Sequence, residues 1–318
     1  MNESEALIIP GMIESNEIKL LFNSASKIVL NDNDQIIEFG AFFGRSTNCI
    51  AQGLLANPTY NKNCKFLTYD SFECDEDGWF AIHVVGHAKA GKVIELIQRK
   101  EKKKINFFKI FEHYLTPYID KRVVYPVVNE LLDSKPEQGE IALIHIDSPK
   151  YYEEFKTIFY RFLPKTRVGS VIIFQDFFYH WSASLILVVA ILIEKKYIVV
   201  ESSAATSLAC KVLKIPGTEE ILEIDLMMQN ENVCLDYFEV AVNACNKEKI
   251  DRYESFVPRI ILAKIQWLYS KKRYSEAADT ITNYLKGNNS FGRGILDDFL
   301  EMLKHGFSIR KLFEKDHQ

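Results

Sequence analysis

The sequence predicts an α/β fold in which a doubly wound, mostly parallel sheet of seven strands is followed by a mainly helical C-terminal region. The first observation is that short apolar segments, rich in β-branched residues, alternate with helical patterns over residues 35–214. Strands that helices cover on both faces have this composition, and strand–helix alternation favours parallel strands joined by right-handed crossovers. The second observation is that the pattern is helical from Val257 to the end of the chain.

The expected elements follow each other in a regular order. An N-terminal helix at residues 17–28 comes first. No helical pattern separates the last two strands, so we expect them to pair as an antiparallel hairpin at one end of the sheet. The expected strands are residues 35–40, 65–70, 122–128, 141–147, 170–176, 197–202 and 207–214. The expected helices between them are residues 47–56, 79–99, 105–119, 151–163 and 182–193.

A chain of 318 residues is long enough for one large domain with an appendage. The pattern changes at Pro216-Gly217, so we expect an α/β domain with its N-terminal helix at residues 1–216 and a mainly helical region at residues 217–318. In the second region, YSEAADTITNYL resembles one helix of a tetratricopeptide repeat. No second copy follows at that period, which favours an ordinary helical appendage.

Composition and charge exclude several classes of protein. The formal net charge of −4 gives no general affinity for polyanions, so we expect no nucleic-acid partner. The basic run at residues 99–104 is interpreted as the solvated end of a helix, with contact to a phosphate-bearing substrate as the alternative. The apolar run at residues 185–193 is about half the length that crosses a bilayer, so we expect a buried helix and no membrane partner.

The six cysteines are scattered without metal-binding or disulfide spacing, which fits a reducing compartment. Residues 1–15 lack the basic and apolar regions of a signal peptide. We therefore expect a cytoplasmic protein. Apolar helices near both ends of the chain are compatible with a homodimer.

The stretch IIEFGAFFGRST, residues 36–47, has the pattern of a strand that turns into a helix around a ligand. Gly40 and Gly44 allow a ligand to approach bare backbone, and the helix that starts near Ser46 offers unpaired N–H groups. The spacing is Gly-x-x-x-Gly and lacks the third glycine of the dinucleotide fingerprint Gly-x-Gly-x-x-Gly. The turn therefore gives weak support to a pyrophosphate ligand.

Two acidic residues stand at the ends of the first two expected strands. Asp70 is placed where a carboxylate accepts hydrogen bonds from a ribose diol, and Glu38 ends the first strand. Two carboxylates suit a ligand with a positive charge and an amino group better than they suit a diphosphate. S-adenosylmethionine is such a ligand.

These segments resemble a known family. IIEFGAFFGRST resembles motif I of the class I S-adenosylmethionine-dependent methyltransferases, in the branch that contains catechol O-methyltransferase and the macrocin-type sugar O-methyltransferases. YDSFE and LIHIDSPKYYEEFKTIFYRFLPKTRVGSVIIFQDF are similar to later motifs of the same branch, and the likeness covers residues 30–215. It implies a Rossmann-like methyltransferase sheet and O-methylation of a small hydroxylated acceptor, a sugar or natural-product intermediate. The implied cofactor-binding residues are Glu38, Gly40, Ala41, Phe42, Gly44, Ser46, Asp70, Ser71 and Asn129.

The same resemblance implies a magnesium site at the ends of the fourth and fifth strands. Its ligands would be Asp147, Gln175 and Asp176, which would orient the acceptor hydroxyl. Gln175 stands where the branch usually has a second aspartate, and one fewer negative charge should weaken the site. Taken alone, Asp147 could instead cap the following helix.

The residue that removes the acceptor proton stays open among three candidates. Lys150 matches the catalytic lysine of catechol-type sites and, with Asp147, forms the implied catalytic pair. His83 and His87 lie one helical turn apart in residues 74–91, a segment that we expect to cover the acceptor pocket. Two histidines without a third ligand are a weak metal signal, so a role as base is the better interpretation.

Two other functions remain as alternatives. The first is a non-catalytic methyltransferase-like module that recruits a partner through its helical C-terminal region, as Gln175 and the repeat-like helix suggest. The second is a nicotinamide-dependent enzyme, against which the missing third glycine argues.

Overall fold

The computed structural model describes residues 3–148, 151–286 and 302. The chain divides into two compact units, Met1–Gln175 with Ala209–Gly217 and Asp176–Leu208 with Thr218–Gln318. A functional division after residue 216 remains a prediction. Among the described helices, none combines the length and apolarity needed to cross a bilayer.

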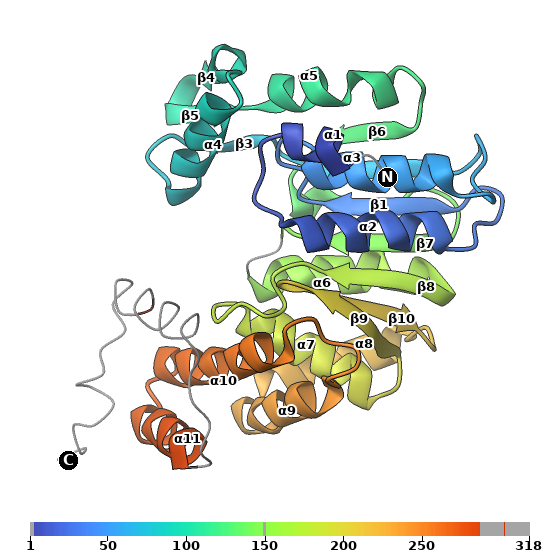
Figure 1. The fold of residues 1–318 in the computed structure, drawn as a ribbon. Helices are drawn as coiled ribbons and strands as arrows, with labels where there is room; N and C mark the ends of the chain where they lie inside the picture. Colours follow the sequence, from blue (N-terminus) through green and yellow to red (C-terminus); the bar gives the residue numbers. More distant parts are fainter. Residues whose placement is uncertain (1–2, 149–150, 287–301, 303–318) are drawn as a thin grey trace. The chain divides into compact units, whose positions relative to one another are not determined.

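The central sheet has seven strands in the order β6-β2-β1-β7-β8-β10-β9 (Figure 1). β1 pairs in parallel with β2 and β7, β2 also pairs in parallel with β6, and β7 with β8. The chain passes from β1 through β2 to β6 on one side and returns to β7 and β8 on the other, so the strand order reverses between β1 and β7. The sheet confirms the predicted doubly wound fold. Its strands are β1 (Gln35–Phe39), β2 (Lys65–Asp70), β6 (Val124–Val128), β7 (Ile141–Ile146), β8 (Thr166–Phe174), β9 (Ile198–Ala204) and β10 (Ser207–Val212).

An insert between β2 and β6 departs from the predicted pattern. It forms a second sheet in the order β3-β5-β4, made by β3 (Glu73–Asp75), β4 (Gln98–Lys100) and β5 (Lys104–Asn106). The helix expected over residues 79–99 is shorter: α4 (Trp79–Ala90) ends at Gly91, and a Cβ at Gly91 would lie 2.4 Å from Pro10. The next helix, α5, spans Phe108–Ile119 and starts after β5.

The basic run at residues 99–104 is not a helix end, so that prediction is wrong. It is the hairpin of β4 and β5 joined by a 3₁₀ turn over Glu101–Lys103. The turn holds Lys102 and Lys103 in left-handed backbone, with φ of 59° and 56°. Its basic residues form ion pairs with the acidic segment that contains β3, and Lys104 is the register partner of Asp75. Opposite charges paired across strands favour a hairpin over a helix.

Three helices pack together beside the first strands. They are α1 (Glu3–Ile8), α2 (Ser15–Lys27) and α3 (Arg45–Ala56), drawn in blue in Figure 1. α2 buries Ile18, Leu21 and Ala25 on one face. A Cβ at Gly53 of α3 would lie 2.6 Å from the carbonyl oxygen of Phe22, so glycine permits the close crossing of α2 and α3. α6 (Tyr152–Arg161) follows β7.

The second unit is mainly helical. α7 (Ala183–Glu194) is apolar and almost entirely buried, which confirms that residues 185–193 belong to a buried helix, and it packs on α9 (Glu231–Ala244) and α10 (Tyr253–Ser270). α8 (Thr218–Gln229) precedes α9, and Asn230 caps α9 through its side-chain oxygen. The repeat-like sequence forms α11 (Tyr274–Lys286), which packs on α10.

Candidate functional site

The predicted site residues meet along one edge of the sheet. Four backbone hydrogen bonds connect consecutive strand ends: Asn129 N–H to Asp70 O at 3.0 Å, Gly40 N–H to Tyr69 O at 2.9 Å, Asp147 N–H to Phe39 O at 2.9 Å and Gln175 N–H to Ile146 O at 2.9 Å. These bonds align the carboxyl ends of β6, β2, β1, β7 and β8. In an open α/β sheet this edge binds ligands, and the reversal between β1 and β7 lies at its centre.

The glycine turn after β1 has a backbone that most residues cannot adopt. Gly40, Phe42 and Gly44 have φ of 90°, 49° and 93°, and Gly44 is the N-cap of α3. A Cβ at Gly40 would lie 2.8 Å from the backbone nitrogen of Ser148. A Cβ at Gly44 would lie 2.1 Å from a methyl carbon of Leu115. Both glycines are therefore required by the packing of the chain itself, whatever ligand the turn holds.

Asp70 is tied to this turn through its carboxylate. Its Oδ2 accepts a hydrogen bond from Phe42 N–H at 2.9 Å, and its Oδ1 accepts one from Phe72 N–H at 2.7 Å. Burial raises the pKa of Asp70 to about 6, although hydrogen bonds from the backbone N–H groups of Phe72, Phe42 and Ala41 act in the opposite direction. Each carboxylate oxygen can accept more than one hydrogen bond, so Asp70 keeps capacity for a ligand hydroxyl.

Glu38 lies at the centre of a buried polar cluster under the same edge. Its side chain is fully enclosed. Oε2 accepts hydrogen bonds from the hydroxyls of Thr47 at 2.5 Å and Thr68 at 2.8 Å, and Oε1 lies 3.2 Å from Nδ1 of His145. Thr68 and His145 are the register partners of Glu38 on the two neighbouring strands, which explains why the three side chains meet.

His145 carries a raised pKa in this cluster. Burial alone lowers its pKa, but the hydrogen bond and charge of Glu38 raise it, and Asp147 and Gln175 act in the same direction. The net shift is upward, which favours the protonated imidazolium, the form that pairs with the enclosed Glu38 carboxylate. Such a pair connects β1 to β7 two residues before Gly40 and Asp147.

Gln175, one of the three expected magnesium ligands, is engaged with another buried side chain. The amide Nε2 of Gln175 donates a hydrogen bond to Oε1 of Glu17 at 2.9 Å, and both side chains are buried. Asp176 follows in left-handed backbone with φ of 60°. In the part of the chain that the structure describes, no three histidine, cysteine, aspartate or glutamate side chains are grouped to hold a metal ion.

The two histidines of α4 lie in different surroundings. The ring of His83 lies 4.4 Å from Trp79, which is exposed. The ring of His87 lies 5.7 Å from Phe42 of the glycine turn, measured between centroids. The pKa of His87 is lowered, mainly by burial and further by the positive charges of Arg45 and His83. This shift favours the neutral imidazole, the form that can accept a proton.

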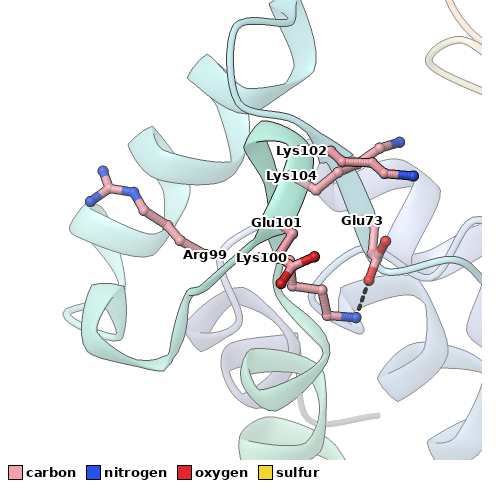
Figure 2. Close-up of a pocket in the computed structure, with 6 residues that line it drawn as sticks. All are labelled: Glu73, Arg99, Lys100, Glu101, Lys102 and Lys104. Carbon is pink, nitrogen blue, oxygen red and sulfur yellow. Dashed lines mark hydrogen bonds and ion pairs between the residues drawn. The ribbon is translucent and has the colours of Figure 1, made fainter.

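A cleft of about 620 Å³ lies on the insert. Figure 2 shows the side chains of Lys102 and Lys104 on the same side of the β4–β5 hairpin as Glu73 of β3, and Arg99 on the opposite side. Exposed ion pairs join the basic run to residues 73–77, which favours a structural role for this run over phosphate binding. These pairs are Arg99–Glu76 at 2.8 Å, Lys100–Glu73, Lys103–Asp77 at 2.8 Å and Lys104–Asp75 at 3.3 Å.

The remaining predicted residues divide into three groups. Ser46 is buried in the first turn of α3, and Ala41 is buried in the glycine turn. Ser71 and Asn129 follow β2 and β6 at the same edge and are partly exposed. Lys150 lies outside the described residues.

Sequence reasoning missed the partners of Glu38. Thr68 follows the apolar pair Phe66-Leu67 of β2, and His145 is the one polar residue of β7; both stand at the register position of Glu38. That coincidence is the signal that could have identified the cluster. Arg45, which anchors an N-terminal segment described below, had no comparable signal because its partners are backbone carbonyls.

The chain matches the model of a known protein family. A family model described as a methyltransferase domain matches residues 37–177. This range begins in β1 and ends just after β8, so it contains every strand end described above. No curated protein matches the sequence.

Several solved structures are similar to the chain at low identity. The O-methyltransferase NovP is 14% identical with a TM-score of 0.47, over 64% of this chain and 83% of that one. The S-adenosylhomocysteine-bound methyltransferase PaMTH1 of Podospora anserina is 14% identical with a TM-score of 0.42, over 67% and 83%. An O-methyltransferase from Bacillus cereus is 14% identical with a TM-score of 0.42, over 67% and 87%.

Proposed function

We propose that this chain, which carries a methyltransferase domain in residues 37–177, transfers the methyl group of S-adenosylmethionine to a hydroxyl group of a small acceptor, a sugar or natural-product intermediate. The observation that carries the proposal is the aligned edge where the glycine turn and Asp70 meet. A partly buried carboxylate beside a tight turn suits a ligand that combines a ribose with a positive charge.

The residues of this edge fit the cofactor. Asp70 would accept hydrogen bonds from the ribose hydroxyls, and Gly40, Ala41, Ser71 and Asn129 would border it. When bound, the cofactor supplies an electrophilic methyl group. The chain must hold the acceptor in line with that group, exclude water and remove the hydroxyl proton.

Glu38 supports the site without touching a ligand in this proposal. Its carboxylate is enclosed by Thr47, Thr68 and His145, and these contacts bind the first helix turn and two strands to β1. We therefore assign Glu38 as a positioning residue for the glycine turn. Its expected role as a direct cofactor contact is replaced by this indirect one.

The proposed reaction contains no step through a metal ion. Gln175 adds no negative charge to the implied ligand set, and its Nε2 is bound to Glu17, so this set is a weak one for magnesium. Asp147 is proposed to orient the acceptor hydroxyl by accepting its hydrogen bond. It is partly exposed at the end of β7, between the glycine turn and Gln175.

His87 is the proposed base, and its pKa makes the proposal testable. A histidine acts as a base in its neutral form, and the pKa of His87 is lowered below its usual value of 6.5. We expect kcat/KM to fall with decreasing pH only below pH 6.5, and this acid limb to disappear in His87→Gln. If the limb persists in His87→Gln but is absent in Lys150→Met, the lysine is the base instead.

The reaction itself is tested with S-adenosylmethionine that carries a labelled methyl group. Purified protein is incubated with it and with a small-molecule cell extract, with and without EDTA. We expect label in an alkali-stable ether and equal yields in both samples. Label in no small molecule would contradict O-methylation of such an acceptor, and loss of the product with EDTA would contradict the metal-free step.

A further inference from the structure

Residues 9–17 connect α1 to the first turn of α2, and we call them the N-terminal strap. The strap is fixed at the start of α3 by Arg45, the residue after Gly44. The Nε of Arg45 donates a hydrogen bond to the carbonyl oxygen of Ile9 at 2.6 Å, and its Nη1 donates one to that of Ile13 at 3.0 Å. One guanidinium group thus holds both ends of the Ile9–Ile13 stretch beside the glycine turn.

The strap is fixed a second time at the end of β8. Gln175 donates its amide hydrogen bond to Oε1 of Glu17 at 2.9 Å, and the exposed fractions of the two side chains are 6% and 2%. Oε2 of Glu17 accepts a hydrogen bond from the backbone N–H of Glu14 at 2.8 Å, which completes the capping box of α2. Both carboxylate oxygens of Glu17 are therefore engaged.

Close packing holds the middle of the strap. A Cβ at Gly91, the C-cap of α4, would lie 2.4 Å from the ring of Pro10. A Cβ at Gly11 would lie 3.1 Å from the Cβ of Arg45. The strap thus touches α3 and the end of α4, and α4 contacts the glycine turn through Phe42.

The positions of the two attachments define what the strap spans. Arg45 starts α3, which follows β1 and the glycine turn, and Gln175 stands just after β8. β7 lies between those two strands in the sheet, and it ends at Asp147. A segment fixed on both sides of β7 borders the edge where cofactor and acceptor would meet.

We infer that the N-terminal strap forms a wall of the methyl-transfer site and that Gln175 is the positioning residue that fixes it there. This inference rests on the proposed function for the identity of the ligand. It also explains the departure at residue 175, because a carboxylate there would face the carboxylate of Glu17. An amide supplies the N–H donor that Glu17 needs.

The test exchanges the two partners. Gln175→Glu places two carboxylates together and should free the strap, whereas the double variant Glu17→Gln/Gln175→Glu restores one amide and one carboxylate in reversed positions. Gln98→Glu, at an exposed position of β4, adds the same charge elsewhere and serves as the control. Two quantities are measured in each protein: hydrogen exchange of residues 9–17 and the Kd for S-adenosylhomocysteine.

We expect Gln175→Glu to speed exchange of the strap amides and to raise the Kd about tenfold, about 1.4 kcal/mol. The double variant should recover most of both effects, and the control should show neither. Unchanged strap exchange in Gln175→Glu would overturn the inference, as would an unchanged Kd or a double variant no better than the single one. New magnesium binding by Gln175→Glu with unchanged exchange would instead assign residue 175 to a metal site.

The two arms separate the inference from the proposed function. If the wild-type protein binds no S-adenosylhomocysteine, the proposed function fails. The exchange arm still decides whether Gln175 fixes the strap. If the wild type and Gln175→Glu bind S-adenosylhomocysteine equally well, the proposed function is retained and the inference that the strap forms a wall of the site is wrong.

Discussion

Replacing Glu38 with alanine should lower the free energy of unfolding by about 3–5 kcal/mol, the usual cost of removing one partner of a buried ion pair. The change leaves the imidazole of His145 and the hydroxyls of Thr47 and Thr68 enclosed without their common acceptor. None of these groups can reach water without opening the sheet. Denaturant unfolding followed by circular dichroism measures the loss.

A double-mutant cycle tests whether the pair is the cause. Glu38→Ala and His145→Ala are measured alone and together, and we expect the double variant to lose less than the sum of the single losses by about 1–3 kcal/mol. Glu38→Gln should be milder than Glu38→Ala because an amide still accepts a hydrogen bond from a threonine hydroxyl. Additive losses, or a loss below about 1 kcal/mol for Glu38→Ala, would show that the cluster does not hold the strands together.

Replacing Asp70 with asparagine should weaken S-adenosylhomocysteine binding about 10- to 100-fold, about 1.4–2.7 kcal/mol, the range of hydrogen bonds to charged groups. Both oxygens of Asp70 accept backbone N–H groups, from Phe42 and Phe72. Asparagine has one oxygen, so its NH₂ group must face one of these donors. The substitution therefore both disturbs the glycine turn and weakens the group that accepts hydrogen bonds from the ribose. Asp75→Asn, at an exposed position of β3, is the matched control.

The pH dependence of binding gives an independent check on Asp70. The ionised carboxylate accepts ribose hydroxyls, so a proton on Asp70 competes with the ligand. Because burial raises the pKa of Asp70 to about 6, affinity should be constant above pH 7 and fall by up to about tenfold per pH unit below pH 6. Asp70→Asn should lack this fall. A wild-type affinity that stays constant down to pH 5 would mean that Asp70 does not face the ligand.

The sheet is predictable from the sequence because each strand is marked locally. Apolar β-branched segments of five to nine residues stand between helical patterns, and the structure keeps β2 at residues 65–70 as expected. The glycine turn is predictable for a similar reason, since Gly40 and Gly44 mark its positive φ angles. Features that a short stretch of sequence encodes by itself can therefore be predicted.

The contacts that give the site residues their roles are not local. Glu17 and Gln175 are 158 positions apart, and Glu38 and His145 are 107 apart. The sequence does not show whether a carboxylate at a strand end contacts a ligand or an enclosed imidazole. The insert was missed for another reason: its strands are three residues long and charged, and cross-strand ion pairs replace the apolar pattern that identifies a strand.

Calorimetric titration of the wild-type protein with S-adenosylhomocysteine at pH 7.5 tests the central claim most directly, since the claim is that the edge formed by the glycine turn and Asp70 holds this cofactor. We predict one site per chain with micromolar affinity, reduced in Asp70→Asn and unchanged in Asp75→Asn. No heat of binding at millimolar ligand would contradict the claim, and so would equal affinity in wild type and Asp70→Asn.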